Sequence, residues 1–140
     1  MKKILFFLFL SLSAFLNANE KSNKLADLLH SFGNNGEYAQ MDSVYNLIIH
    51  EDHYKQDKLY ALNITLDYAR FLNQKGDSER ANTLLTQIRE NAMPLEKFPE
   101  NTIAHQLQEI AAIATYEIAY GQWQNNQLPA ARETAEEAIN

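Results

Sequence analysis

Three polar residues, Asn63, Arg70 and Asn73, are spaced so that they could share one face of a helix. Side chains three, seven and ten residues apart on an α-helix project from the same side. A guanidinium between two carboxamides can bind a carboxylate or a peptide backbone through directional hydrogen bonds. The pattern therefore indicates a peptide-binding face, and the alternative is an Arg70 side chain that is solvated or locally paired.

Three aromatic residues, Tyr116, Tyr120 and Trp123, follow one another at intervals of four and three. On a helix this spacing forms a stripe that could seat an apolar side chain of a partner. The alternative is a core role, because an amphipathic helix buries one of its faces. Trp123 could also cover the last turn of the helix. The sequence leaves these readings open.

The segment His50-Glu51-Asp52-His53 contains the residue types that bind metal ions. Two imidazoles three residues apart can converge on a helix, and the carboxylates between them offer oxygen ligands. A second pair of ligands at a diagnostic spacing is missing, so we expect no metal and no other cofactor. The chain also lacks a nucleophile elbow, a phosphate-binding glycine loop and a paired-carboxylate arrangement. We therefore expect a protein that is not an enzyme.

The elements that must position these residues are helices. Apolar residues recur at intervals of three and four along the chain, and glycine and proline are scarce. The pattern predicts an all-α protein with helices at residues 21–32, 38–50, 58–74, 78–91, 101–124 and 129–139. Residues that tolerate positive φ separate the members of each pair, at Gly33-Asn34-Asn35-Gly36, Lys75-Gly76-Asp77 and Asn125-Asn126-Gln127. The prediction is three antiparallel hairpins at about 21–50, 58–92 and 101–140.

The three hairpins share a pattern when they are aligned on Gly36, Gly76 and Asn126. Small or apolar residues return seven residues before and five residues after each of these positions: Leu29, Ala69 and Ala119, then Met41, Ala81 and Ala131. Small side chains allow two antiparallel helices to approach closely. The repetition therefore indicates one structural unit used three times.

The second hairpin resembles the tetratricopeptide repeat family through Tyr68-Ala69, Leu72, Gly76-Asp77, Ala81, Leu85, Ile88 and Pro94. The first hairpin resembles it through Leu25, Leu28, Leu29, Phe32, Gly36-Glu37-Tyr38 and Tyr45. The resemblance implies antiparallel hairpins stacked as a short right-handed solenoid with a concave ligand-binding groove. It places these residues in the groove: Asn23, Ala26, His30, Asn63, Leu66, Arg70, Asn73, Ile113, Tyr116, Tyr120 and Trp123. The turns lie 40 and 50 residues apart, against about 34 in the family, so longer helices or joints must absorb the difference.

The first 18 residues have the composition of a secretory signal peptide. Lys2 and Lys3 precede the apolar run from Ile4 to Leu10, and a small-residue cleavage point follows at Ala18. The run is shorter than the roughly 20 apolar residues of a stable membrane span. We therefore expect a periplasmic or secreted mature chain of a bacterial type, with no stable membrane span. The chain has no cysteine, so lipid attachment through a cysteine and disulfides are excluded.

Charge limits the class of partner. The formal net charge is −6, and loss of the two leader lysines makes it −8. This charge disfavours nucleic acids and anionic membranes. The leading hypothesis is an exported interaction module, covering residues 21–140, that binds a peptide or protein in its groove. The alternative is the N-terminal sensory segment of a larger membrane receptor, because Ala131, Ala135 and Ala138 of the last helix have no following helix to cover them. Self-association through this C-terminal helix is also possible.

Overall fold

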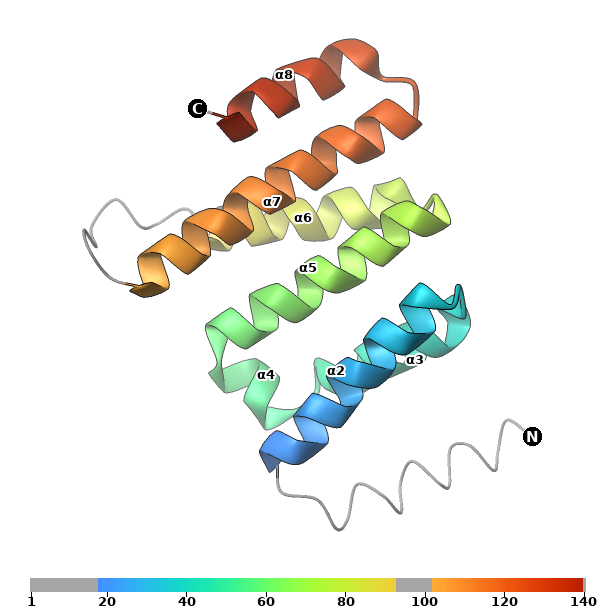
Figure 1. The fold of residues 1–140 in the computed structure, drawn as a ribbon, viewed down its shortest axis with the longest axis vertical. Coiled ribbons are helices and arrows are strands. Elements are labelled where there is room, and N and C mark those ends of the chain that lie inside the picture. Colours follow the sequence, from blue (N-terminus) through green and yellow to red (C-terminus); the bar gives the residue numbers. More distant parts are fainter. Residues whose placement is uncertain (1–17, 93–101, 140) are drawn as a thin grey trace.

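The computed structural model describes residues 18–92 and 102–139, and the regular elements in these ranges are all α-helices (Figure 1). They are α2 (Ala18–Asn34), α3 (Tyr38–Ile48), α4 (Asp52–Gln56), α5 (Lys58–Lys75), α6 (Ser78–Ala92), α7 (Thr102–Gln124) and α8 (Leu128–Ile139). The prediction of an all-α protein is confirmed, and the six predicted helices begin and end within three residues of the observed bounds. Residues 1–17 of the predicted leader and the joint that contains Pro94 lie outside the described residues.

Three tight turns join the helices of each pair, and they share one hydrogen-bond pattern. Gly36, Gly76 and Asn126 adopt positive φ values of 71°, 87° and 60°. The next amide in each turn donates to the carbonyl five residues earlier, at 2.8 Å for Glu37 to Phe32, 2.8 Å for Asp77 to Leu72 and 2.9 Å for Gln127 to Gln122. A left-handed residue followed by this bond ends a helix and satisfies its last carbonyls.

The hairpins follow one another so that their first helices are neighbours. Helix α5 lies between α2 and α7 and contacts both, and α7 also packs on α6 and α8 (Figure 1). Helices α3 and α6 lie behind α2 and α5 in this view. The described residues contain no helix that is both long enough and apolar enough to cross a bilayer.

The core lies between the helices of each hairpin and continues from one hairpin to the next. Leu29, Met41, Leu72 and Leu85 are fully buried. Ala69 and Ala81, the expected points of close approach between α5 and α6, are also fully buried. Removal of such apolar surface from water stabilises the fold by about 25 cal/mol per Å². Helix α5 is buried on more than one face, because it packs against α2, α6 and α7.

The additional residues between the first two turns contain a short helix. Helix α4 occupies part of the joint before α5 and packs against α2 and α5. The Tyr54 hydroxyl lies 2.8 Å from Thr65 Oγ1, which fixes α4 on α5. Helix α7, with 23 residues, accounts for part of the longer second interval. The expectation that longer helices or joints absorb the extra residues is met in these two elements.

Asp57 begins α5 by capping its first turn, because its Oδ1 accepts a hydrogen bond of 3.0 Å from the backbone N–H of Tyr60. We predict that Asp57→Ala lowers the free energy of unfolding by about 1 kcal/mol, the usual effect of losing a cap. Asp57→Asn should lose only a few tenths, since asparagine caps helices equally well. Urea denaturation at neutral pH measures both, and equal losses would show that the charge matters and the cap does not.

The same cap makes the stability depend on pH. The backbone hydrogen bond from Tyr60 lowers the pKa of Asp57 below its ordinary value. The stabilisation is therefore complete above the unfolded-state pKa of about 3.9 and is lost as the pH falls through the folded-state value. Relative to Asp57→Asn, the wild-type protein should become less stable as the pH is lowered from about 5 to about 3.

Candidate partner-binding site

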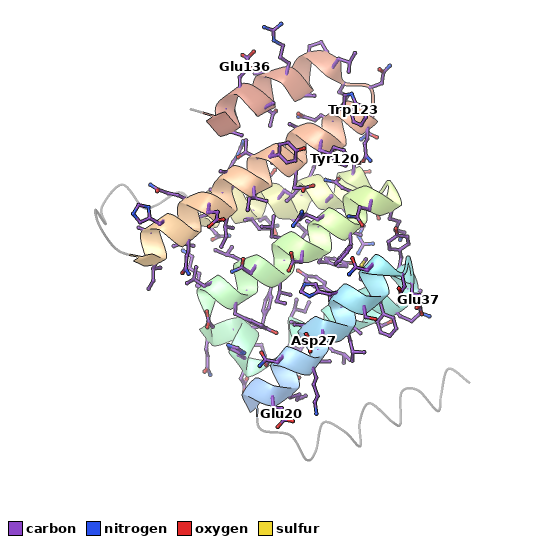
Figure 2. The ribbon with its side chains drawn as sticks, viewed as in Figure 1. Glu20, Asp27, Glu37, Tyr120, Trp123 and Glu136 are labelled. Atoms are coloured by element: carbon purple, nitrogen blue, oxygen red, sulfur yellow. The ribbon has the colours of Figure 1, made fainter. Side chains whose placement is uncertain are left out.

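Helix α7 carries three aromatic residues, of which Tyr116 and Trp123 are mostly exposed and Tyr120 is partly buried. Tyr116 and Trp123 are each 59% exposed. The Tyr120 and Trp123 rings lie 5.9 Å apart between centroids, tilted by 30°, near the turn that leads to α8 (Figure 2). Gln124 Nε2 donates a 3.0 Å hydrogen bond to the Tyr120 hydroxyl oxygen. We call Tyr116, Tyr120 and Trp123 the outer stripe; the alternative core role does not apply to Tyr116 and Trp123.

A shallow cavity of about 570 Å³ adjoins the C-terminal end of the outer stripe. It lies between the α5–α6 turn and the α7–α8 turn, and its wall includes Gly76, Ser78, Trp123, Gln124, Asn125, Asn126 and Leu128. Leu128 is 54% exposed. Aromatic and aliphatic carbon beside side-chain amides is a composition suited to peptide side chains and backbone, because it offers both apolar contact and hydrogen bonds.

Asn63 and Asn73, which were expected to share a helix face with Arg70, differ in their exposure to solvent. Arg70 Nε lies 3.0 Å from Glu117 Oε1 of α7, and half of the Arg70 side chain stays exposed. Asn63 is exposed, and its amide donates to the Leu59 carbonyl of its own helix. Asn63 therefore does not join Arg70 in a common cluster of contacts.

The prediction that Asn73 faces a ligand-binding groove is wrong. Asn73 is fully buried, and its Nδ2 donates a 3.0 Å hydrogen bond to the backbone carbonyl of Glu117. It lies inside the interface between α5 and α7, not on a ligand-facing surface. The reason is that neighbouring first helices pack closely, so the predicted groove position is covered by the next helix.

Three residues that each carry a buried, unpaired side-chain oxygen lie close to Gly121 of α7. Asn73 Oδ1, Ser78 Oγ and Asn82 Oδ1 have no hydrogen-bond partner among the described residues. A Cβ at position 121 would stand 3.0 Å from Asn73 Oδ1 and 3.4 Å from Asn82 Oδ1. The absent side chain of Gly121 thus lets α7 approach this polar patch of α5 and α6.

A second polar cluster joins α3, α5 and α6. The Tyr68 hydroxyl donates to Asp42 Oδ1 at 2.7 Å and accepts from the Arg80 guanidinium. Arg80 also pairs with Asp77 at 3.3 Å. Burial, together with the neighbouring Asp42 carboxylate, raises the pKa of Tyr68 far above its ordinary value. Tyr68 therefore stays protonated and donates, and this cluster is a link between helices whose charges are already paired.

The histidines of the possible metal segment are engaged in other contacts. His50 Nδ1 lies 2.6 Å from the Asn46 carbonyl, and the His53 ring stacks on Tyr60 at 4.1 Å. Across residues 18–92 and 102–139, no three His, Asp or Glu side chains come together in a way that could hold a metal ion.

Comparisons with protein-family models, with curated proteins and with solved structures find no match to this chain.

The sequence interpretation missed the partners of Arg70 and Asn73, although a signal for one of them was present. An acidic residue stands nine positions before each turn residue: Asp27, Asp67 and Glu117. The residue six positions before each turn residue is basic or carries a hydroxyl group. A hydrogen-bond donor at one repeated position and an acid at another would have indicated a pair between the first helices of successive hairpins.

Proposed function

We propose that this chain is an exported, tetratricopeptide-type helical repeat protein that binds a partner polypeptide on the outer face of α7 and performs no catalysis. The observation that carries the proposal is the outer stripe, since two large aromatic side chains on one helix face are each 59% exposed. Large aromatic residues dominate the binding energy of protein interfaces when a partner covers them. The leader-like N-terminus supports a periplasmic or secreted location.

The repeated geometry supports the family resemblance. The three turns have the same backbone hydrogen bonds, and α2, α5 and α7 are neighbours in chain order. Each unit therefore contacts mainly the adjacent unit, as in a solenoid. On this basis we propose a short right-handed array. Among the described residues, α7 is the first helix of the last hairpin.

The chemistry of the surface favours a polypeptide over a nucleic acid. The net charge of −6 opposes phosphate binding, whereas exposed aromatic rings beside side-chain amides suit peptide side chains and backbone. Asn63 and Arg70 lie on α5, and their part in binding stays a prediction from the sequence, which the variant Arg70→Ala tests for Arg70. Asn73 is not proposed as a contact, because it is buried.

Site-specific photo-crosslinking tests the proposal in cells that express the full chain. A benzophenone amino acid in place of Tyr116 should capture a partner polypeptide, since this side chain is exposed on the outer stripe. The matched control replaces Arg132, whose side chain is 83% exposed on α8. Equal crosslinking at both positions would contradict a specific site on α7.

Purified protein then gives the energetic test. Trp123→Ala should weaken capture of the crosslinked partner at least tenfold, because truncation of a central aromatic contact typically removes about 2 kcal/mol of binding energy. The melting temperature should change little, since the side chain is mostly exposed. A large fall in melting temperature with unchanged capture per folded molecule would make Trp123 a structural residue.

A further inference from the structure

The first helices of successive hairpins meet in one repeated register. His30 Nε2 of α2 lies 2.8 Å from Asp67 Oδ2 of α5. Arg70 Nε of α5 lies 3.0 Å from Glu117 Oε1 of α7. In both pairs the nitrogen-bearing residue stands six positions before its turn residue, and the acid stands nine positions before the next turn residue.

A second pair of positions repeats one turn further along each helix. A Cβ built on Gly33 would lie 2.6 Å from the Phe71 ring, and one built on Gly121 would lie 3.0 Å from Asn73 Oδ1. The residue three before one turn thus meets the residue five before the next, and one member of each pair is glycine. Both pairs advance in the same direction along the two helices, so the first helices run parallel.

Helix α7 carries the same positions but has no covering helix among the described residues. Leu66 and Asn73, ten and three residues before the turn of α5, are 4% and 0% exposed. Their equivalents on α7, Tyr116 and Trp123, are each 59% exposed. The outer stripe is therefore the repeated stacking surface, and none of the helices in residues 18–92 and 102–139 stacks on it in this register.

The chemistry of the open positions describes what they would accept. Tyr120 occupies the position of His30 and Arg70, which each pair with a carboxylate. Its oxygen accepts from Gln124, which leaves its hydrogen to donate to an incoming acceptor. Trp123 occupies the position of Gly33 and Asn73. Because a bulky residue here must face a small one, the incoming helix needs a glycine or alanine at that point.

The N-terminal helix of a second copy of this chain matches these positions only in part, because Asp27 and Ser31 stand at the acidic and small positions but the charged Lys24 stands where α7 has Ala114. The outer face of α2 is formed by Glu20, Lys24, Asp27 and Ser31, which are all exposed (Figure 2 labels Glu20 and Asp27). The equivalent positions on α5 include the buried Ile64 and Phe71. A polar terminal face is typical of a repeat that ends an array, and the net charge of −6 on each copy adds repulsion.

We propose that the outer stripe binds an amphipathic helix of a partner polypeptide that runs parallel to α7. The helix carries an apolar residue, an acidic residue three positions later and a small residue four positions after that, as in Ala114, Glu117 and Gly121. The acid accepts the Tyr120 hydroxyl hydrogen, and the small residue lies on Trp123. This inference rests on the proposed function and specifies its partner as a helix that packs on α7 in the way that α7 packs on α5.

The test uses Trp123 as its own reporter, since it is the only tryptophan in the chain. The probe is a stapled helical peptide without aromatic residues, as long as the 18 residues of α5, with Ile, Glu and Gly in the stated pattern. Titration into purified protein should shift Trp123 emission to shorter wavelength with saturation below about 1 mM. A Glu→Lys peptide and a Gly→Leu peptide should each bind at least tenfold more weakly.

Control measurements separate the proposal from its alternatives. Tyr120→Phe should remove the difference in affinity between the Glu peptide and a matched Gln peptide, because the hydroxyl that distinguishes them is gone. Absence of a shift at about 1 mM peptide, or equal binding of a register-scrambled peptide, would overturn the helical partner. A shift of Trp123 emission when the protein is concentrated without peptide would also overturn it, because it would identify a second copy of the chain as the occupant. If cells still show crosslinks at Tyr116, the proposed function stands without the helix; if crosslinks are absent too, both fail.

Discussion

Gly33→Ala is expected to lower the free energy of unfolding by about 2 kcal/mol, although alanine is the better helix former. Gly33 lies in α2, and a Cβ there would stand 2.6 to 2.7 Å from three ring carbons of Phe71. Phe71 is only 8% exposed and lies in the core cluster. The Phe71 ring cannot move away from the added methyl group unless α2 also moves away from α5. The cost of this overpacking exceeds the roughly 1 kcal/mol that alanine gains over glycine in helix propensity.

The sign of this effect should reverse when the ring is removed. In a Phe71→Ala background the added methyl group enters free space, so Gly33→Ala should stabilise the protein by up to about 1 kcal/mol. Urea denaturation of the four proteins in this cycle measures the coupling directly. Gly121→Ala is a second control, because its Cβ would approach one oxygen at 3.0 Å in place of a ring, and its effect should be smaller. Destabilisation by Gly33→Ala that is independent of residue 71 would contradict the contact.

The helices and turns could be predicted because their causes are local. The apolar intervals of three and four fixed the six predicted helices to within three residues. Gly36, Gly76 and Asn126 were expected at positive φ because these residue types tolerate it, and all three adopt it. Helix α4 was missed because its five residues contain no buried side chain, so no hydrophobic period marks it.

The candidate site could be predicted only in part, since its contacts are not local. The spacing of Tyr116, Tyr120 and Trp123 placed them on one face, but spacing alone did not decide whether that face is buried. The role of Asn73 was wrong because its partner, Glu117, is 44 residues away in the chain. A side chain that could bind a ligand can equally bind the neighbouring helix, and only the packing of α5 on α7 distinguishes the two.

Whether a polar side chain binds a ligand or the neighbouring helix has the largest energetic consequence at Arg70. Arg70→Ala is expected to lower the free energy of unfolding by about 1 to 2 kcal/mol, because it leaves Glu117 with only 10% of its side chain exposed and no cation beside it. This value is below the 3 to 5 kcal/mol of a fully buried pair, since half of the Arg70 side chain remains in water. Urea denaturation at neutral pH measures the loss.

The matched variant Glu117→Gln separates charge burial from packing. In the Arg70→Ala background, glutamine removes the uncompensated charge and keeps the shape, so the double variant should regain most of the lost stability. Capture of the partner per folded molecule should be unchanged in Arg70→Ala if the guanidinium serves the α5–α7 interface alone. If stability stays at the wild-type value while capture falls, Arg70 would instead be a binding residue, and the open surface would extend from the outer stripe across the edge of α5.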